Sequence, residues 1–416
     1  MKRIHRIFII WAWALPLLVS GQDLAHYQRI AAQNNPGLQA QYKAFEAALA
    51  KVAQQSSLPD PQLSFGYFLS PVETRVGPQQ ARFSLSQLFP WFGTLKAREK
   101  AAALRAEARY QAFLAAQSQL NYRVAQAYYP LYELHRHLKI EKENLRLLKT
   151  YKTLANSRFE SGKGSMVAVL RVDMQLKEAQ TRQSTLKQKK APLLSQFNHL
   201  LNRPEGTPVA LPDSLGLGLL PQNHPSDSLL SGHPLLAELR LQQKASQAQE
   251  QAAVRQGLPQ MGLGVDYALV APRGDASVPG NGQDILMPML SLQLPIFRKK
   301  HQAAQREAHI KAAQYRLLRK EQANSLRQSY AQVRYKCQQQ TERVQLREAQ
   351  IQSAEQALRL LLAAYRQGEN DLETVLDMQK KIWAFKKQRT SALVEYHLAR
   401  AEWAYLMTKS NQSENE

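Results

Sequence analysis

Four short segments of alternating polarity constrain the fold more than any other feature of this 416-residue chain. They lie at 62–70, 80–88, 260–270 and 285–294, and each has one apolar face and one face of small or polar residues. This alternation predicts β-strands of the kind that form the wall of a transmembrane β-barrel. The flanking helices offer few wide apolar stripes, so a two-layer domain with helices covering the sheet fits the pattern less well.

Four strands are too few to close a barrel. The smallest bacterial barrels have about eight strands, and an open edge in lipid leaves backbone groups unpaired. We therefore expect several copies of the chain to share one barrel, which has eight strands with two copies and twelve with three. The stretch "LPDPQLSFGYFLSP" (58–71), which interrupts a helical composition, is then one chain's contribution to a shared wall.

The chain repeats one pattern twice. "PQLSFGY" (61–67) resembles "PQMGLGV" (259–265) at an offset of 198 residues, and "RFESGKGSMVAVL" (158–170) resembles "AYRQGENDLETVL" (364–376) at an offset of 206. The pairs "NNPGLQAQ" with "GHPLLAEL" and "SQLFPWF" with "SLQLPIF" occur in the same order. This order indicates a duplication, in which each half has a helix, two strands, a long helix, a turn and a helix.

The start of the chain has the features of a secretory signal peptide. Basic Lys2, Arg3 and Arg6 precede an apolar run at 7–19 that is too short to span a bilayer comfortably, and small residues follow it. An N-terminal membrane anchor is the alternative. The expected organisation is a signal peptide (1–21), a first repeat (22–201), a linker (202–232), a second repeat (233–408) and a polar tail (409–416).

Apolar residues at steps of four and three predict long helices packed in heptad fashion. The stretch from Gly93 to about Arg158 is broken only by Pro130, which we expect to kink the helix. The two seams are Leu120, Val124, Ala127, Leu131, Leu134, Leu138, Leu145 and Leu148, then Leu326, Tyr330, Val333, Cys337, Val344, Ile351, Ala354, Leu358, Leu361 and Tyr365. Glu141 is a polar intruder in the first seam. We expect a mixed, mostly helical fold in which long antiparallel hairpins form a wall.

The formal net charge is +22, and the basic residues are spread along the predicted helices. An exported protein rarely meets nucleic acid, so we expect no nucleic-acid partner. Solvated helix faces are the plainer interpretation of the charge. Anionic lipid head groups and an anionic permeant remain as alternatives.

No pattern of catalytic or metal-binding residues is present. His135 and His137 are two residues apart and point to different faces of a helix, and Cys337 is the only cysteine. The chain contains no zinc-protease motif and no serine-centred elbow. We therefore predict that the protein is not an enzyme and has no catalytic residues, no cofactor and no metal site.

The two-fold repeat and several motifs resemble the TolC family of outer-membrane efflux ducts. The resemblance covers nearly all of the chain after the signal peptide and is carried by "LPDPQL", "SQLFPWFGTL", "RFESGKGS" and "YRQGENDLETVLDMQ". "LPDPQL" followed by "FPWFGTLKAR" is most similar to the branch that serves heavy-metal and related cation pumps. The resemblance implies a homotrimer with a 12-stranded barrel in the outer membrane and a tube of helices, an α-barrel, in the periplasm. It also implies two partners, a periplasmic adaptor protein and an inner-membrane pump of the RND or a similar type, for a passive duct with an unknown permeant.

The resemblance also implies which residues lie at the periplasmic end. Arg158, Gly162, Ser165 and Gly368 match the helix turns that meet the adaptor. Tyr365 matches a tyrosine that ties the closed tip, and Asp377 matches a carboxylate in the bore, where three copies would form a ring that attracts cations. Two positions depart from the family pattern: Ala168 stands where a carboxylate is expected, and Asn370 where an arginine is expected.

Two other classes of protein fit part of the pattern. An exported coiled-coil stalk, such as an adhesin, explains the heptads and the signal peptide but leaves the four strands unexplained. A periplasmic adaptor has one helical hairpin and a lipoyl-like β-domain, whereas this chain has two hairpins and no such domain.

Overall fold

The computed structural model describes residues 24–218, 232–275 and 277–409. The predicted signal peptide, much of the predicted linker and nearly all of the polar tail lie outside the described residues. The chain divides into two compact units, which we call the turn unit and the sheet unit. The turn unit comprises Met1–Asn35, Leu120–Leu220 and Lys336–Ala401, and the sheet unit comprises Pro36–Gln119, Pro221–Tyr335 and Glu402–Glu416.

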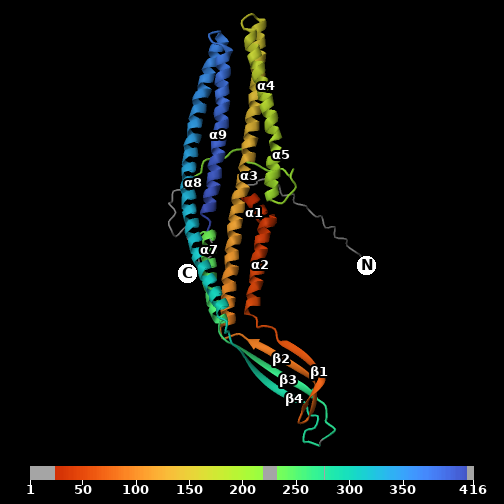
Figure 1. Cartoon of the computed structure of the whole chain (residues 1–416). Coiled ribbons are helices and arrows are strands. Elements are labelled where there is room, and N and C mark those ends of the chain that lie inside the picture. Colours follow the sequence, from red (N-terminus) through yellow and green to blue (C-terminus); the bar gives the residue numbers. More distant parts are fainter. Residues whose placement is uncertain (1–23, 219–231, 276, 410–416) are drawn as a thin grey trace, which may run out of the picture. The chain divides into compact units, whose positions relative to one another are not determined.

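Helices make up most of the described chain (Figure 1). In chain order they are α1 (Leu24–Asn34), α2 (Pro36–Ser56), α3 (Thr94–Glu160), α4 (Met166–Gln188), α5 (Lys190–Leu200), α7 (Pro234–Gln256), α8 (Lys299–Gln367) and α9 (Leu372–Leu406). The order matches the predicted repeat, because a long helix follows each strand pair and a second helix follows each long one. Within the described residues, none of these helices is both long and apolar enough to cross a membrane.

The strands form one antiparallel sheet in the sheet unit. β1 (Gln62–Thr74), β2 (Gly77–Phe89), β3 (Gln260–Val270) and β4 (Ile285–Gln293) lie in the order β1-β2-β3-β4. The pairing of β2 with β3 joins the two halves of the repeat. Within the described residues β1 and β4 each pair with one strand, so the outer edge of each is open.

The predicted first strand pair was too short. We expected strands at 62–70 and 80–88, but β1 and β2 continue until only Arg75 and Val76 separate them. Pro and Gly in this stretch indicated a loop. In the structure Pro71 lies where the register shifts, between Tyr67 and Val72, and the hairpin tolerates it there.

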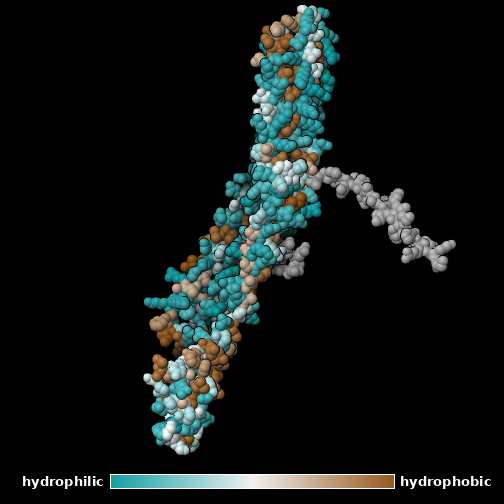
Figure 2. Space-filling view, turned by 90° about the vertical axis from the view of Figure 1, so that its right-hand side faces the viewer, coloured by the Kyte–Doolittle hydropathy of each residue, from teal (hydrophilic) through white to brown (hydrophobic). Residues whose placement is uncertain are grey.

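One face of the sheet is apolar and exposed. Cross-strand neighbours on this face include Leu63 with Leu85, Phe65 with Phe83, and Leu85 with Val265. Leu63 is 72% exposed and Phe65 is 63% exposed. Exposure of so many apolar side chains to water is unfavourable, so this face is expected to be covered. Figure 2 shows hydrophobic side chains over the part of the surface that the strands form, near the lower end of the view.

The other face of the sheet is small and polar. Ser84, Ser86 and Gly264 lie on it, and Arg82 of β2 forms an ion pair with the buried Asp266 of β3. An ion pair between neighbouring strands is stable on a face that does not contact lipid. The two faces therefore have the alternation expected of a barrel wall, apolar outside and polar inside.

Most residues of the predicted heptad seams are buried, whereas Leu138, Leu145, Ile351, Leu358 and Leu361 are half-buried. Val124, Leu131 and Leu148 of α3 and Val333 and Val344 of α8 are at most 4% exposed. Pro130 lies inside α3, which continues as one helix of 67 residues. The structure therefore confirms the long helix and most of the two seams.

Candidate functional site at the paired helix turns

The two long hairpins of the turn unit reverse direction through the same kind of turn. After α3, the amide of Gly162 donates to the carbonyl of Phe159, and the amide of Lys163 donates to that of Arg158. After α8, Gly368 donates to Tyr365 and Glu369 donates to Ala364. Both patterns are Schellman caps, in which two nested hydrogen bonds satisfy the last carbonyls of a helix.

Glycine is required at the same place in both caps. Gly162 has φ +70° and Gly368 has φ +87°, the left-handed conformation that residues with a Cβ adopt at a cost. The two glycines are 206 residues apart, which is the offset of the sequence repeat. The structure therefore places the predicted glycines at equivalent points, in the turns that follow α3 and α8.

Ser165 begins the helix that follows the first turn. Its backbone is extended, and its hydroxyl accepts a hydrogen bond of 3.3 Å from the amide of Ala168. A serine in this position satisfies one of the free amides at a helix start. Ala168, which stands where the resemblance predicts a carboxylate, thus takes part in the cap through its backbone.

Arg158 and Tyr365 link the two hairpins. The Arg158 guanidinium donates a hydrogen bond of 2.5 Å to the carbonyl of Tyr365 and lies 4.4 Å from the centre of the Tyr365 ring. A guanidinium over a tyrosine ring adds a cation–π attraction of about 1 kcal/mol. The structure therefore brings together a residue predicted at the adaptor tip and a residue predicted at the gate.

A second pair of charges joins the same hairpins. Arg171 of α4 forms an ion pair with Glu373 of α9, although both side chains are about half exposed. Asp173 of α4 accepts from Lys152 of α3 at 2.5 Å and from Lys177 at 3.0 Å, and these hydrogen bonds lower the pKa of Asp173 below its usual range. The pairs between helices could not be predicted from the sequence, because they depend on which faces of α3, α4 and α9 meet.

Beneath the turns the hairpins share an apolar core. Its buried members come from α3, α4, α8 and α9, namely Leu148, Tyr151, Ala155, Val169, Val172, Leu176, Ala179, Tyr365, Leu372, Val375 and Leu376. Tyr365 is thus anchored by packing as well as by Arg158. The core therefore joins all four helices beneath the turns.

Asp377 stands apart from these contacts. It lies in α9, directly after the buried Val375 and Leu376, and its side chain is exposed. Glu373, which pairs with Arg171, lies one turn before it on the same helix. The structure of one chain therefore leaves Asp377 accessible, and its place in a ring of three stays a prediction.

The comparisons identify the class of protein that this arrangement defines. The family model described as outer membrane efflux protein matches residues 28–201 and 226–404, one match in each half of the chain. The chain belongs to this family. The match confirms the predicted family, the predicted class of outer-membrane efflux channel, the predicted location in the outer membrane and the two-fold repeat. No curated protein sequence matches the chain.

Solved structures of channel proteins share the fold. CusC has 18% identity, a TM-score of 0.79, and coverage of 94% of this chain and 93% of its own. The outer membrane protein VceC of Vibrio cholerae has 16% identity, a TM-score of 0.74, and coverage of 93% and 96%. The open-state MtrE outer membrane channel of Neisseria gonorrhoeae has 18% identity, a TM-score of 0.74, and coverage of 92% and 88%. These likenesses confirm the predicted fold class over nearly the whole chain.

Proposed function

We propose that the protein is the outer-membrane channel of a tripartite efflux system and that it works as a homotrimer. The observation that carries this proposal is the sheet, which has two open edges and an exposed apolar face. Lipid would cover that face, and pairing of β4 of one copy with β1 of the next would satisfy both edges. Three copies give a 12-stranded barrel, within the range of closed barrels in bacterial outer membranes.

The turn unit is the proposed contact with a periplasmic adaptor. Arg158, Gly162, Ser165 and Gly368 surround the two turns, and the backbone caps there leave small, exposed surfaces. An adaptor would connect these turns to an inner-membrane pump of the RND or a similar type. Tyr365 and Asp377 are the proposed gate residues. Arg158 would hold Tyr365, because Asn370 and Ala168 stand where the family pattern has an arginine and a carboxylate.

The proposed channel is a passive path and performs no chemical step. Energy and most of the choice of permeant would come from the pump. The bounds predicted for the two repeats, 22–201 and 233–408, stay a prediction, and so does the similarity to the cation-pump branch.

The mass of the detergent-solubilised complex tests the proposal. One chain has a mass of 47.2 kDa, so a trimer is expected at three times that mass less any removed leader. The complex should need detergent for extraction and should conduct ions in a planar bilayer. A monomer, or a protein released from membranes without detergent, would instead favour a coiled-coil stalk.

A further inference from the structure

An apolar hollow lies where the sheet meets the helices of the sheet unit. Its volume is about 410 Å³, within the range of about 300–1,000 Å³ that is typical of small-molecule sites. Its lining residues are all apolar and come from the segment before β1, the end of β2, the start of α3 and the start of β3: Leu58, Phe89, Pro90, Trp91, Phe92, Gly93, Leu95, Met261 and Leu263. Phe92 is 78% exposed, so the chain leaves this apolar surface uncovered.

The hollow belongs to the apolar face of the sheet. On that face Leu85 pairs with Val265, and further along the same two strands Phe89 pairs with Met261. Side chains alternate along a strand, so residues two or four positions apart share a face. Phe89, Met261 and Leu263 therefore lie on the same face as Leu85 and Val265. In the proposed barrel this is the face that lipid covers.

The hollow lies at the periplasmic end of the sheet. β2 and β4 lead directly into α3 and α8, the long helices that extend away from the sheet (Figure 1). Trp91 and Phe92, at the exit from β2, are in edge-to-face contact with ring centres 6.0 Å apart. Aromatic side chains of this kind gather at the level where a bilayer meets water. The hollow is therefore placed at the leaflet that faces the periplasm, which consists of phospholipids.

One cation lies at the rim of the hollow. Arg255 of α7 is exposed, and its Nη1 donates a hydrogen bond of 3.0 Å to the carbonyl of Phe92. A Cβ at Gly93 would lie 2.6 Å from the same nitrogen, so glycine permits this close approach. Within the described residues, the bond to this neutral carbonyl is the only hydrogen bond or ion pair of Arg255. Its charge and most of its five N–H donors are therefore available to an anion.

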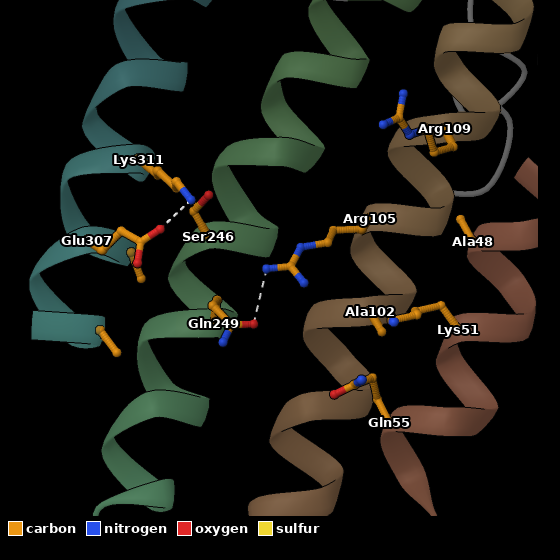
Figure 3. Close-up of a pocket in the computed structure, with 12 residues that line it drawn as sticks. Ala48, Lys51, Gln55, Ala102, Arg105, Arg109, Ser246, Gln249, Glu307 and Lys311 are labelled. Atoms are coloured by element: carbon orange, nitrogen blue, oxygen red, sulfur yellow. Dashed lines mark hydrogen bonds and ion pairs between the residues drawn. The ribbon is translucent and has the colours of Figure 1, made fainter. Parts of the chain in front are cut away.

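Contacts between helices hold Arg255 in this position. Arg105 of α3 donates a hydrogen bond of 3.1 Å to Gln249 of α7, and Figure 3 shows α8, α7 and α3 side by side at this level. Nearer the sheet, the side chain of His301 in α8 lies 3.4 Å from the place that a Cβ would take at Gly257, the residue that ends α7. The ends of three helices therefore meet beside the hollow.

Further cations lie at the same helix ends. Each half of the chain leaves its second strand through an apolar residue, Pro, an apolar residue and Phe, at 89–92 and at 294–297, before basic residues begin. The cations that follow are Lys96, Arg98, Lys100, Arg298, Lys299 and Lys300, and the acids in the flanking stretches are Asp60 and Glu99. Positive charge therefore prevails where the sheet joins the helices. A basic cluster beside an apolar surface is typical of a site for anionic head groups.

We propose that the hollow binds an anionic phospholipid, with an acyl chain against Trp91, Met261 and Leu263 and the phosphate at Arg255. A guanidinium binds phosphate through two parallel hydrogen bonds, which gives it an advantage over a lysine ammonium at such a site. The apolar lining then contacts the chain, and the basic helix ends contact the head group. This inference rests on the proposed function, because the apolar face meets lipid only in a closed barrel.

A neighbouring copy of the chain is the other candidate occupant. It would join at the outer edge of β1 or of β4, whereas most of the hollow lies over the ends of β2 and β3, the two middle strands. Neighbouring strands are about 4.8 Å apart, so a copy at either edge leaves the middle strands open to lipid. The surplus of cations also favours a charged head group over an apolar segment of another copy.

Native mass spectrometry of the detergent-solubilised trimer tests the inference. We expect one bound phosphatidylglycerol per chain, with an affinity at least about fivefold higher than that of phosphatidylcholine with the same acyl chains, because one basic residue changes the affinity for an anionic head group by about this factor. Arg255→Gln should remove most of this preference and leave the binding of phosphatidylcholine unchanged. Glycerol 3-phosphate, which has the phosphate but no acyl chain, should fail to displace the lipid at equal concentration.

Arg240→Gln is the matched control. Arg240 is an exposed arginine of the same helix, 15 residues before Arg255 and therefore about 22 Å away. Its loss should leave the preference for phosphatidylglycerol unchanged, and the trimer mass in the same spectra shows that each variant assembles.

Several results would overturn the inference while the channel function stands. They are equal affinity of the wild type for the two lipids, equal effects of the two variants, and displacement of the lipid by glycerol 3-phosphate. A conducting trimer that binds neither lipid would also overturn it, because a neighbouring copy then fills the hollow. Absence of trimers or of conductance would overturn the proposed function and this inference with it.

Discussion

Lys387 of α9 donates a hydrogen bond of 2.5 Å to the carboxylate of Glu141 in α3. Glu141 has no exposed surface, and it also accepts from Asn144 at 3.0 Å and from Arg182 of α4 at 3.3 Å. One carboxylate therefore ties three helices of the turn unit together. It occupies a position of the heptad seam that is otherwise apolar.

Removal of Lys387 alone should destabilise the protein. Lys387→Met leaves the buried charge of Glu141 with weaker partners, and we expect a loss of about 3 kcal/mol. The double variant Glu141→Gln and Lys387→Met should recover most of this loss, because no buried charge remains. Guanidinium unfolding followed by the helical circular dichroism signal measures both. A double variant as unstable as Lys387→Met would show that packing, and not the buried charge, sets the cost.

The stability of the turn unit should fall in acid because of Glu141. Burial alone would raise the pKa of Glu141, but hydrogen bonds from Lys387 and Asn144 and the charges of Lys387 and Arg182 lower it below 4.5. A lowered folded-state pKa stabilises the fold above the unfolded value, and this contribution is lost as the pH falls through the folded value. The thermal unfolding midpoint, Tm, of the wild type should therefore decrease once the pH falls below about 4.5. The Tm of Glu141→Gln should decrease less over the same range.

His233 should cause a second loss of stability at a higher pH. It caps the start of α7 by accepting from the amide of Leu235, and burial lowers its pKa from 6.5 to about 4. Between pH 6.5 and 4, His233 is protonated in the unfolded chain but not in the folded chain. The free energy of unfolding therefore falls by up to about 3 kcal/mol as the pH is lowered through this range. His233→Asn keeps a capping side chain and should abolish this slope in unfolding experiments from pH 7 to 4.5. An unchanged slope would assign the effect to other groups.

The equivalence of the two turns could be predicted from the sequence, because cap geometry is local. Gly162 and Gly368 are separated by the offset of the repeat, and a glycine after a long helix predicts a cap of this type. The seam residues were also predictable, since a step of four and three determines which side of a helix is buried. Glu141 was visible as a polar intruder, although its partners were not.

The contacts between helices could not be predicted in the same way. Arg158 reaches Tyr365 across 207 residues, and this depends on how two hairpins are rotated and shifted against each other. The same holds for Arg182 and Lys387, which reach Glu141 from two different helices. Periodicity gives the face of each helix but leaves the register between helices open.

Bulky residues at the turns should lower efflux while trimers still assemble. Gly162→Val and Gly368→Val force a β-branched residue into a left-handed conformation, at a cost of about 1–2 kcal/mol. The strain distorts the caps and the proposed adaptor surface but leaves the sheet untouched. Drug or metal resistance of cells that carry each variant, with trimer mass as the check on assembly, measures the effect.

Gly206→Val is the matched control for these variants. Gly206 lacks a positive φ, and a Cβ there would meet nothing within 4 Å. Export should therefore remain at the wild-type level. Equal export by Gly162→Val, Gly368→Val and Gly206→Val would remove the turns from the proposed contact with the adaptor.

Asp377 should control block of the channel by cations from the periplasmic side. Its side chain is exposed on α9, nine residues after Gly368, so three-fold symmetry can bring three copies around the axis. Three carboxylates at one level concentrate multivalent cations, and Asp377→Ala should raise the blocking concentration of a trivalent cation by roughly tenfold. Single-channel recording in a planar bilayer, with the cation added on the periplasmic side, gives this value.

Glu160→Ala separates a ring at Asp377 from a general loss of negative charge near the turns. Glu160 is an exposed acid at the end of α3, beside the first turn, and it forms no part of the proposed gate. Its removal changes the net charge by the same amount and should leave cation block nearly unchanged. If the two variants weaken block equally, diffuse surface charge explains the effect. If neither variant weakens it in a folded trimer, Asp377 lies outside the path of the ions, and the narrow point of the bore must be sought at Tyr365.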